Sequence, residues 1–340
     1  MSEFIHLHVA SAFSGHYGVT RPEIMVEAAA SRGESALAIT DRDGLYGAVK
    51  HIGACLKMGI SPIVGVDLEA VDDAGLSLGR VVVLAHGHDG GLGWSALCAI
   101  VSTAHQKTRK QQNPAIKRSE LARLAVRDGV ALVTVLVGNN SDVGEAALAG
   151  DRTLTAERLK NWRKAFISTR ALVVEITSHL TEPGSPFCNM QANRLLQLAD
   201  SMGIPAVLTN AVRYLEPDDA LTADVLDAAR HLEPLGMFTL QPNAQAWLKP
   251  ASKMRALAIE ITQDQERAKK LIETTMTLAD RCRLNPANDC GWGKPKTPEK
   301  SALGIEGNPF EVLWQKAHAG IDHYYRSANA SLLNQVHHRL

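Results

Sequence analysis

Residues 36–71 read ALAITDRDGLYGAVKHIGACLKMGISPIVGVDLEAV, and this stretch decides the fold. The apolar, β-branched runs at 36–40 and 62–71 are typical of buried strands. Between them, residues 45–58 place apolar side chains at spacings of three and four, which predicts a helix. Gly59 follows the last apolar turn and supplies the expected helix stop. The stretch therefore predicts one strand–helix–strand unit.

The same alternation extends in both directions along the chain. The predicted strands cover residues 5–9, 36–40, 62–71, 80–85, 130–137, 171–177 and 205–209. The predicted helices cover residues 21–31, 45–58, 91–104, 119–126, 155–166 and 187–202. Strands alternating with helices predict parallel strands joined by crossover helices. Seven such strands fit an α/β barrel or a doubly wound sheet, and periodicity alone does not choose between them.

Beyond this alternating region the sequence changes character. We predict a barrel domain over residues 1–230 and a helical extension over 231–290. The Pro, Gly and Lys-rich stretch that follows predicts a linker at 291–307. A C-terminal helix with a polar tail is expected at 308–340.

The composition describes an ordinary water-soluble chain. Its 340 residues are 45% hydrophobic, and 36 Lys and Arg balance 36 Asp and Glu, so no overall basic field indicates a nucleic-acid partner. Apolar runs stay well short of the roughly 20 residues that a membrane helix needs. The five cysteines are scattered, with no CxxC pair, which favours reduced thiols. We expect a cytoplasmic protein with no membrane contact.

The sharpest chemical signal is His6-Leu7-His8 in the first predicted strand. Residues i and i+2 of a strand face the same side, so two histidines at this spacing can chelate one ion. The alternative is an ordinary polar strand end. Asp41 and Asp67 lie at the ends of the next two strands, and Glu175 lies near the end of the sixth. Carboxyl ends of strands build the active sites of α/β barrels.

Four segments in order resemble the PHP (polymerase and histidinol phosphatase) region of bacterial DNA polymerase III alpha-type subunits, a family of nucleotidyltransferases. They are IHLHVASAFS (5–14), ALAITDRDGLYGAV (36–49), SPIVGVDLEA (61–70) and LTNAVRYLEPDD (208–219). The resemblance covers about residues 4–230 and continues more loosely to about 325, where it is similar to the error-prone branch. It implies a distorted seven-stranded (β/α) barrel of PHP type with a smaller C-terminal helical region.

The resemblance also implies which residues would hold metal ions. PHP domains of this group hold two or three ions with His, Asp, Glu and Cys ligands. His6 and His8 match, and Asp67 stands where Glu is usual. The positions at which this chain departs from the ligand pattern are Tyr17, Arg42, Arg80, Leu136, Ala211 and Arg213. The comparison therefore implies a degenerate metal site and no cofactor.

Three of those departures are arginines, which offer no lone pair and would repel a cation. We predict that Arg42, Arg80 and Arg213 take the place of the ions and pair with Asp41, Asp67 or Glu175. A variant of this hypothesis has the arginines bind a phosphate or a DNA end without hydrolysis.

An active site remains an alternative. His86 and His88 form a second His-x-His after the fourth predicted strand. With His6, His8 and Asp67 they could rebuild a partial site for zinc, manganese or magnesium. The chain would then be a metal-dependent phosphoesterase or a 3′–5′ exonuclease.

The resemblance implies that the polymerase core is absent, because the sequence stops near where the resemblance places its start. We predict a catalytically degenerate scaffold or interaction module in DNA replication or repair, with other polymerase subunits as partners. A truncated polymerase fragment without independent function is the second alternative. Direct DNA contact stays open, with basic runs at 109–118 and 294–300 as the candidate segments.

Overall fold

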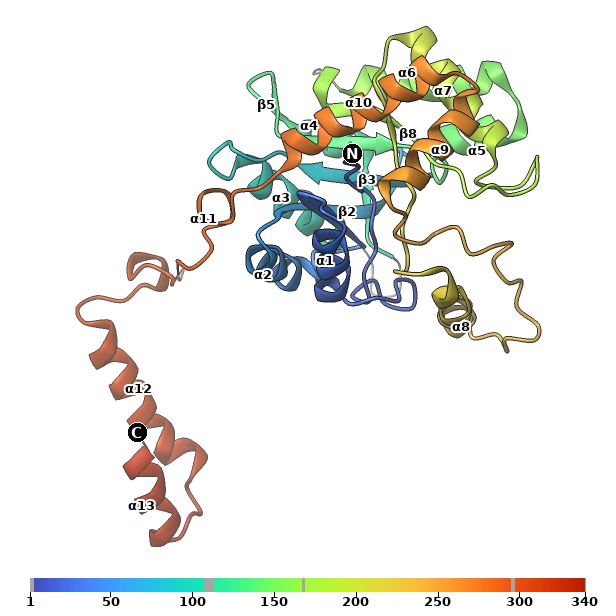
Figure 1. The fold of residues 1–340 in the computed structure, drawn as a ribbon. Coiled ribbons are helices and arrows are strands. Elements are labelled where there is room, and N and C mark those ends of the chain that lie inside the picture. Colours follow the sequence, from blue (N-terminus) through green and yellow to red (C-terminus); the bar gives the residue numbers. More distant parts are fainter. Residues whose placement is uncertain (1–2, 107–112, 167–168, 295–296, 340) are drawn as a thin grey trace. The chain divides into compact units, whose positions relative to one another are not determined.

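A computed structural model describes residues 3–106, 113–166, 169–294 and 297–339. The chain forms two compact units, Met1–Trp292 and Gly293–Leu340 (Figure 1). The basic runs at 109–118 and 294–300 lie partly outside the described residues. None of the described helices combines the length and the apolar character that crossing a bilayer requires.

The first unit is built on one curled, seven-stranded sheet. Its strands are β1 (Ala36–Arg42), β2 (Ser61–Val71), β3 (Ser77–Ala85), β4 (Ala115–Lys117), β7 (Val133–Val137), β8 (Leu172–Ile176) and β9 (Ala206–Leu208). The order is β1-β2-β3-β7-β8-β9, and β4 also pairs with β2. A separate two-stranded ribbon contains β5 (Val126–Arg127) and β6 (Val130–Ala131).

The N-terminal segment, residues 6–10, bridges the two edges of this sheet, at β1 and just beyond β9. On one side, the amides of Ala38 and Thr40 donate to the carbonyls of His6 and Val9. On the other side, the segment exchanges backbone hydrogen bonds with Val212, just beyond β9. The sheet is thereby a distorted barrel of the expected PHP type, and the first predicted strand serves as its closing segment.

One strand runs against the predicted direction. β3 is antiparallel to both of its neighbours, β2 and β7, whereas the sequence predicted parallel strands throughout. The reason is the short connection after β2, where the side chain of Asp72 accepts from the amides of Ala74 and Leu76. Such a hairpin reverses the chain, while a parallel connection needs a crossover of a dozen or more residues. The start of β3 therefore lies beside the carboxyl end of β2.

Helices cover the outside of the barrel. They are α1 (Pro22–Ser31), α2 (Ala48–Met58), α3 (Leu92–Gln106), α4 (Arg118–Ala125), α5 (Asp142–Ala149), α6 (Arg152–Ala165), α7 (Asn189–Met202), α8 (Ala220–His231), α9 (Ala251–Thr262), α10 (Gln265–Cys282) and α11 (Pro286–Asp289). Gly59 and Gly203 end α2 and α7 in the left-handed conformation, with φ of 72° and 63°, as the sequence predicted. The second unit contains α12 (Pro309–Tyr324) and α13 (Ala330–Arg339).

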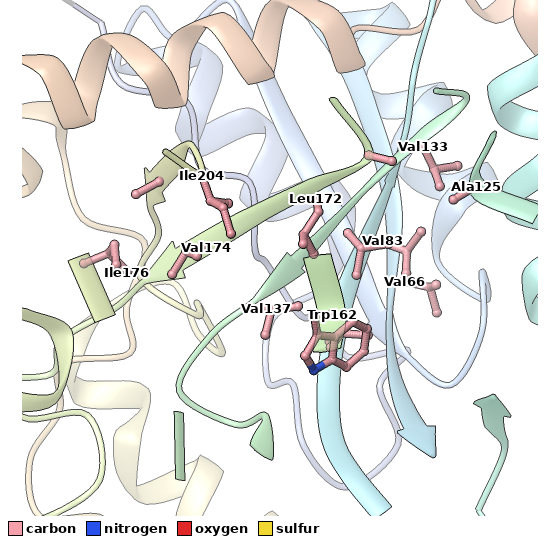
Figure 2. Packing of buried hydrophobic residues seen from close by; sticks show 14 of the residues in the cluster. Val66, Val83, Ala125, Val133, Val137, Trp162, Leu172, Val174, Ile176 and Ile204 are labelled. Carbon is pink, nitrogen blue, oxygen red and sulfur yellow. The ribbon is translucent and has the colours of Figure 1, made fainter. Parts of the chain in front are cut away.

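Apolar side chains fill both faces of the curled sheet. The outer face packs against the helices, with Trp162 of α6 fully buried among valines and leucines of β2, β3, β7 and β8 (Figure 2). The inner face forms a smaller core, closed by Leu278, Ala279 and Cys282 of α10. The helical stretch expected at 231–290 thus includes a helix that packs on the barrel interior. Apolar residues therefore fill the end of the barrel that α10 closes, and polar residues fill the opposite end.

Candidate functional site

Inward-facing polar side chains gather where β1, β2 and β8 end and β3 begins. Side chains alternate along a strand, so Asp67 of β2 faces the same way as Ile63, which lies in the inner core. By the same alternation Glu175 follows Val173, and Arg80 precedes Val82. The carboxyl end of the barrel is therefore lined with charged groups, and Asp67, Glu175 and Arg80 are at positions singled out in the sequence.

Asp67 is held by two arginines. Arg42 Nε lies 3.2 Å from Asp67 Oδ2, and Arg80 Nε lies 2.9 Å from Asp67 Oδ1. The carboxylate is 4% exposed, and the arginine side chains are 20% and 18% exposed. Burial alone would raise the pKa of Asp67, but the charges of Arg80 and Arg42 outweigh it and hold that pKa below its ordinary value. Asp67 thus stays ionised.

Arg80 is bound on more than one side. Its Nη2 lies 2.9 Å from Asp43 Oδ1 and donates to the Asp67 carbonyl at 2.7 Å. Burial opposes the charged form, yet Asp67 and Asp43 raise the pKa of the guanidinium. Asp43, which has a positive φ of 62°, was missed by the sequence reasoning. An acid two residues after Asp41 in the TDRDG turn was the available signal.

A second polar group joins the N-terminal segment to β8. His8 Nδ1 lies 2.7 Å from Glu175 Oε1, and the Thr209 hydroxyl donates to the same oxygen at 2.7 Å. Burial would lower the pKa of His8, but the Glu175 carboxylate outweighs it and raises that pKa. The imidazole of His8 and the carboxylate of Glu175 are therefore hydrogen-bond partners.

His6 has different partners from His8, although the two were expected to share one ion. His6 Nε2 donates to the Lys249 carbonyl at 2.8 Å, which leaves Nδ1 as the lone-pair nitrogen. Burial lowers the pKa of His6 to about 4, and no hydrogen-bond partner reaches Nδ1. Lys249 is itself buried, with its ammonium 2.9 Å from Asn210 Oδ1 and its pKa lowered to about 8 by burial.

Of the three acids predicted as arginine partners, Asp67 pairs with Arg42 and Arg80, whereas Asp41 and Glu175 have other partners. Asp41 accepts hydrogen bonds from the hydroxyls of Ser11 and Ser14 and from the amides of Ser11 and Gly47. It therefore holds the loop after the N-terminal segment against the turn after β1. Glu175 is occupied by His8, as described above.

Arg213 also differs from the prediction. Its partner is Asp227 of α8, at 2.8 Å, and not one of the three expected acids. It donates through Nε and Nη2 to the Tyr17 carbonyl. Arg230 of α8 lies 3.0 Å from the other oxygen of Asp227. An acid and an arginine at i and i+3 were the sequence signal for this pair, but only the fold brings Arg213 to them.

The matching family model, described as "PHP domain", covers residues 6–179. The chain belongs to the PHP domain family. It is 33% identical over 294 residues to the DNA polymerase III subunit alpha of Escherichia coli strain K12, which covers 84% of this chain and 23% of that protein. It is 29% identical over 255 residues to an error-prone DNA polymerase of Mycolicibacterium paratuberculosis, covering 73% of this chain and 22% of that protein.

The chain therefore spans less than a quarter of the length of these relatives. Among solved structures, a putative metal-dependent phosphoesterase from Bifidobacterium adolescentis matches 62% of this chain and 88% of its own. Its TM-score is 0.38 and its identity is 16%. An amidohydrolase from Chromobacterium violaceum matches 62% of this chain and 87% of its own, with the same TM-score and identity.

In this PHP barrel the second His-x-His, His86 and His88, lies at the end opposite the polar site. Because β3 is antiparallel, its last residue Ala85 pairs with Val133, the first residue of β7. His86 therefore lies near the start of β7, where its two ring nitrogens lie 2.9 Å from the Ala131 carbonyl and 2.8 Å from Thr134 Oγ1. The prediction that His86 and His88 stand on the ligand-bearing rim is wrong. The start of β3, with Arg80, lies on that rim instead.

The remaining departures from the family pattern are distributed around the barrel. Leu136 is fully buried in the inner core, and Ala211 has a positive φ of 42° in the segment after β9. Tyr17 lies against Arg42 and Arg213. Within the described residues, no group of three or more His, Cys, Asp or Glu side chains could hold a metal ion.

Proposed function

We propose that this PHP domain is catalytically inactive and acts as a scaffold or interaction module alongside a DNA polymerase of the replication or repair type. The observation that carries the proposal is the double ion pair at Asp67, in which Arg42 and Arg80 each bind one oxygen of the carboxylate. A metal ion at this place would need the oxygens that the arginines occupy.

The positive charges of the arginines also oppose the binding of a metal ion. A guanidinium remains protonated and has no lone pair, so two of them beside Asp67 would repel a divalent cation. His8 Nδ1 and Glu175 Oε1 lie 2.7 Å apart and bind each other. His6 Nδ1 has no hydrogen-bond partner, but a multinuclear hydrolytic centre needs several donors per ion and an open position for water.

An exposed apolar surface supports the interaction role. On α8, Leu221 and Val225 are 61% and 47% exposed, and Leu232 just after the helix is 91% exposed. Met237 in the following loop is 81% exposed. Grouped exposed apolar side chains are typical of contact surfaces. We place the protein in the cytoplasm, with a polymerase polypeptide as its partner.

The test combines elemental analysis with hydrolysis assays on a phosphodiester and on single-stranded DNA, each with and without chelator. We expect no stoichiometric metal and no hydrolysis. An Arg42→His/Arg80→His variant, measured beside the wild type, tests whether the two arginines cause the lack of metal and hydrolysis. It removes both cations and adds two imidazoles. Metal uptake by this variant alone would assign the inactivity to the two arginines. Stoichiometric metal and chelator-sensitive cleavage by the wild type would contradict the proposal and support the phosphoesterase alternative.

A second experiment addresses the partner. A Leu221→Ser/Val225→Ser variant should lose co-purification with a polymerase polypeptide from the same cells, while its thermal stability stays unchanged because both side chains face solvent. A wild-type chain that retains no polymerase polypeptide would instead favour the reading of a fragment without independent function.

A further inference from the structure

Three arginines converge on one tyrosine ring at the polar end of the barrel. The guanidinium carbons of Arg42, Arg213 and Arg230 lie 3.3, 4.1 and 5.8 Å from the centroid of the Tyr17 ring. They come from the end of β1, from the segment after β9 and from α8. Like charges at such distances repel one another, so the fold holds them together against their electrostatics.

The hydrogen bonds already made leave many donors unused. A guanidinium carries five N–H groups. Arg42 uses its Nε on Asp67, and Arg230 uses Nη2 on Asp227. Arg213 uses Nε and Nη2 on the Tyr17 carbonyl and on Asp227. Within the part of the chain that the structure describes, two or more N–H groups of each arginine thus have no hydrogen-bond partner, and the side chains of Arg42 and Arg230 are 20% and 37% exposed.

Four arginines at this end pair with three acids. Arg42 and Arg80 share Asp67, and Arg213 and Arg230 share Asp227, while Asp43 binds Arg80 alone. Burial, together with the charges of Arg42 and Arg213, lowers the pKa of Arg230 even though Asp227 opposes the shift. The neighbouring charges of Arg42 and Arg213 thus add to the effect of burial on Arg230.

We infer that Arg42, Arg213 and Arg230 form a binding site for a phosphate group beside Tyr17. Guanidinium groups bind phosphate through paired, charge-assisted hydrogen bonds, and a dianionic group would offset their mutual repulsion. The phosphate belongs either to a small phosphate such as pyrophosphate or to the end of a DNA strand. The inference extends the proposed function, since a domain that binds without metal would hold this group and not cleave it.

The test measures binding in the presence of EDTA, so that contact through a metal ion is removed. The probes are pyrophosphate, followed by calorimetry, and a fluorescent single-stranded oligonucleotide with either a 5′-phosphate or a 5′-hydroxyl, followed by anisotropy. The variant is Arg230→Gln, because Arg230 is the most exposed of the three arginines. The matched control is Arg127→Gln, whose side chain is 67% exposed on the β5–β6 ribbon, near His86 at the opposite end of the barrel.

We expect saturable binding that Arg230→Gln weakens at least tenfold and Arg127→Gln leaves unchanged. Pyrophosphate binding without a preference for the 5′-phosphate oligonucleotide would identify a small phosphate as the ligand. A tenfold preference for the 5′-phosphate over the 5′-hydroxyl would identify a strand end. Absence of saturable binding to every probe, or equal weakening by both variants, would overturn the inference. Metal-dependent hydrolysis by the wild type, measured separately, would overturn only the proposed lack of catalysis.

Discussion

Replacing Asp67 by asparagine tests whether the double ion pair holds the polar end of the barrel together. Asp67→Asn keeps the size of the side chain and removes its charge, which leaves Arg42 and Arg80 largely buried without their shared carboxylate. Removing one partner of a buried ion pair typically costs about 3–5 kcal/mol, because the remaining charge is uncompensated. We expect a loss of that size in the free energy of unfolding at pH 7.

Urea denaturation of the wild type and the variant measures this loss. The matched control is Asp200→Asn, which breaks the pair with Arg267 on the surface, where the carboxylate is 51% exposed. Exposed pairs contribute roughly 0–1 kcal/mol, so the control should change little. Adding Arg80→Gln to Asp67→Asn should recover part of the loss, because it removes one of the stranded charges.

The dependence on pH gives an independent check. The pKa of Asp67 is lower in the folded chain than its ordinary value, so the ion pair stabilises the fold fully above the unfolded pKa of about 4. The stabilisation is lost as the pH falls through the folded pKa. The difference between wild type and Asp67→Asn should therefore shrink below about pH 4. A loss no larger than that of Asp200→Asn, or a difference that grows with acid, would refute the reasoning.

Three further predictions concern other parts of the chain. Burial raises the pKa of Glu34 to about 8. The folded carboxyl therefore binds its proton more tightly than the unfolded one. The free energy of unfolding should fall as the pH rises from about 4.5 to 8. Glu34→Gln removes this loss, and its urea midpoint should exceed that of the wild type more at pH 9 than at pH 5; an equal difference at both would contradict the assignment. His86→Ala should cost about 1–3 kcal/mol in urea denaturation through its lost hydrogen bonds, with no change in metal content by elemental analysis. Removing residues 293–340 should leave the thermal midpoint of the first unit unchanged, since the two units are separately compact; a lowered midpoint would show that the units stabilise each other.

Much of the barrel could be predicted from local pattern. The strands at 36–40 and 62–71 and the helix between them are present as β1, β2 and α2, because burial on both faces and a 3.6-residue period leave clear marks in the sequence. The direction of β3 was not predictable in this way. A strand has the same apolar pattern in either direction, and only the hairpin at Asp72 reverses it.

In the candidate site, too, the sequence predicted some features and left others open. The presence of Arg42 and Arg80 at expected ligand positions could be read from the sequence, because guanidinium chemistry follows from residue type. Their meeting at Asp67 was one of several pairings that the sequence left open. Arg213 was expected near the same acids but lies 2.8 Å from Asp227, which the sequence reasoning did not single out.

The sequence by itself determined the family and the alternation of strands and helices. The tertiary structure alone decided that the N-terminal segment closes the sheet and which acid each arginine binds. The physical reason is distance along the chain. Helix and strand patterns arise between near neighbours, whereas the contacts of Arg80 with Asp67 and of Arg213 with Asp227 depend on how the whole barrel closes.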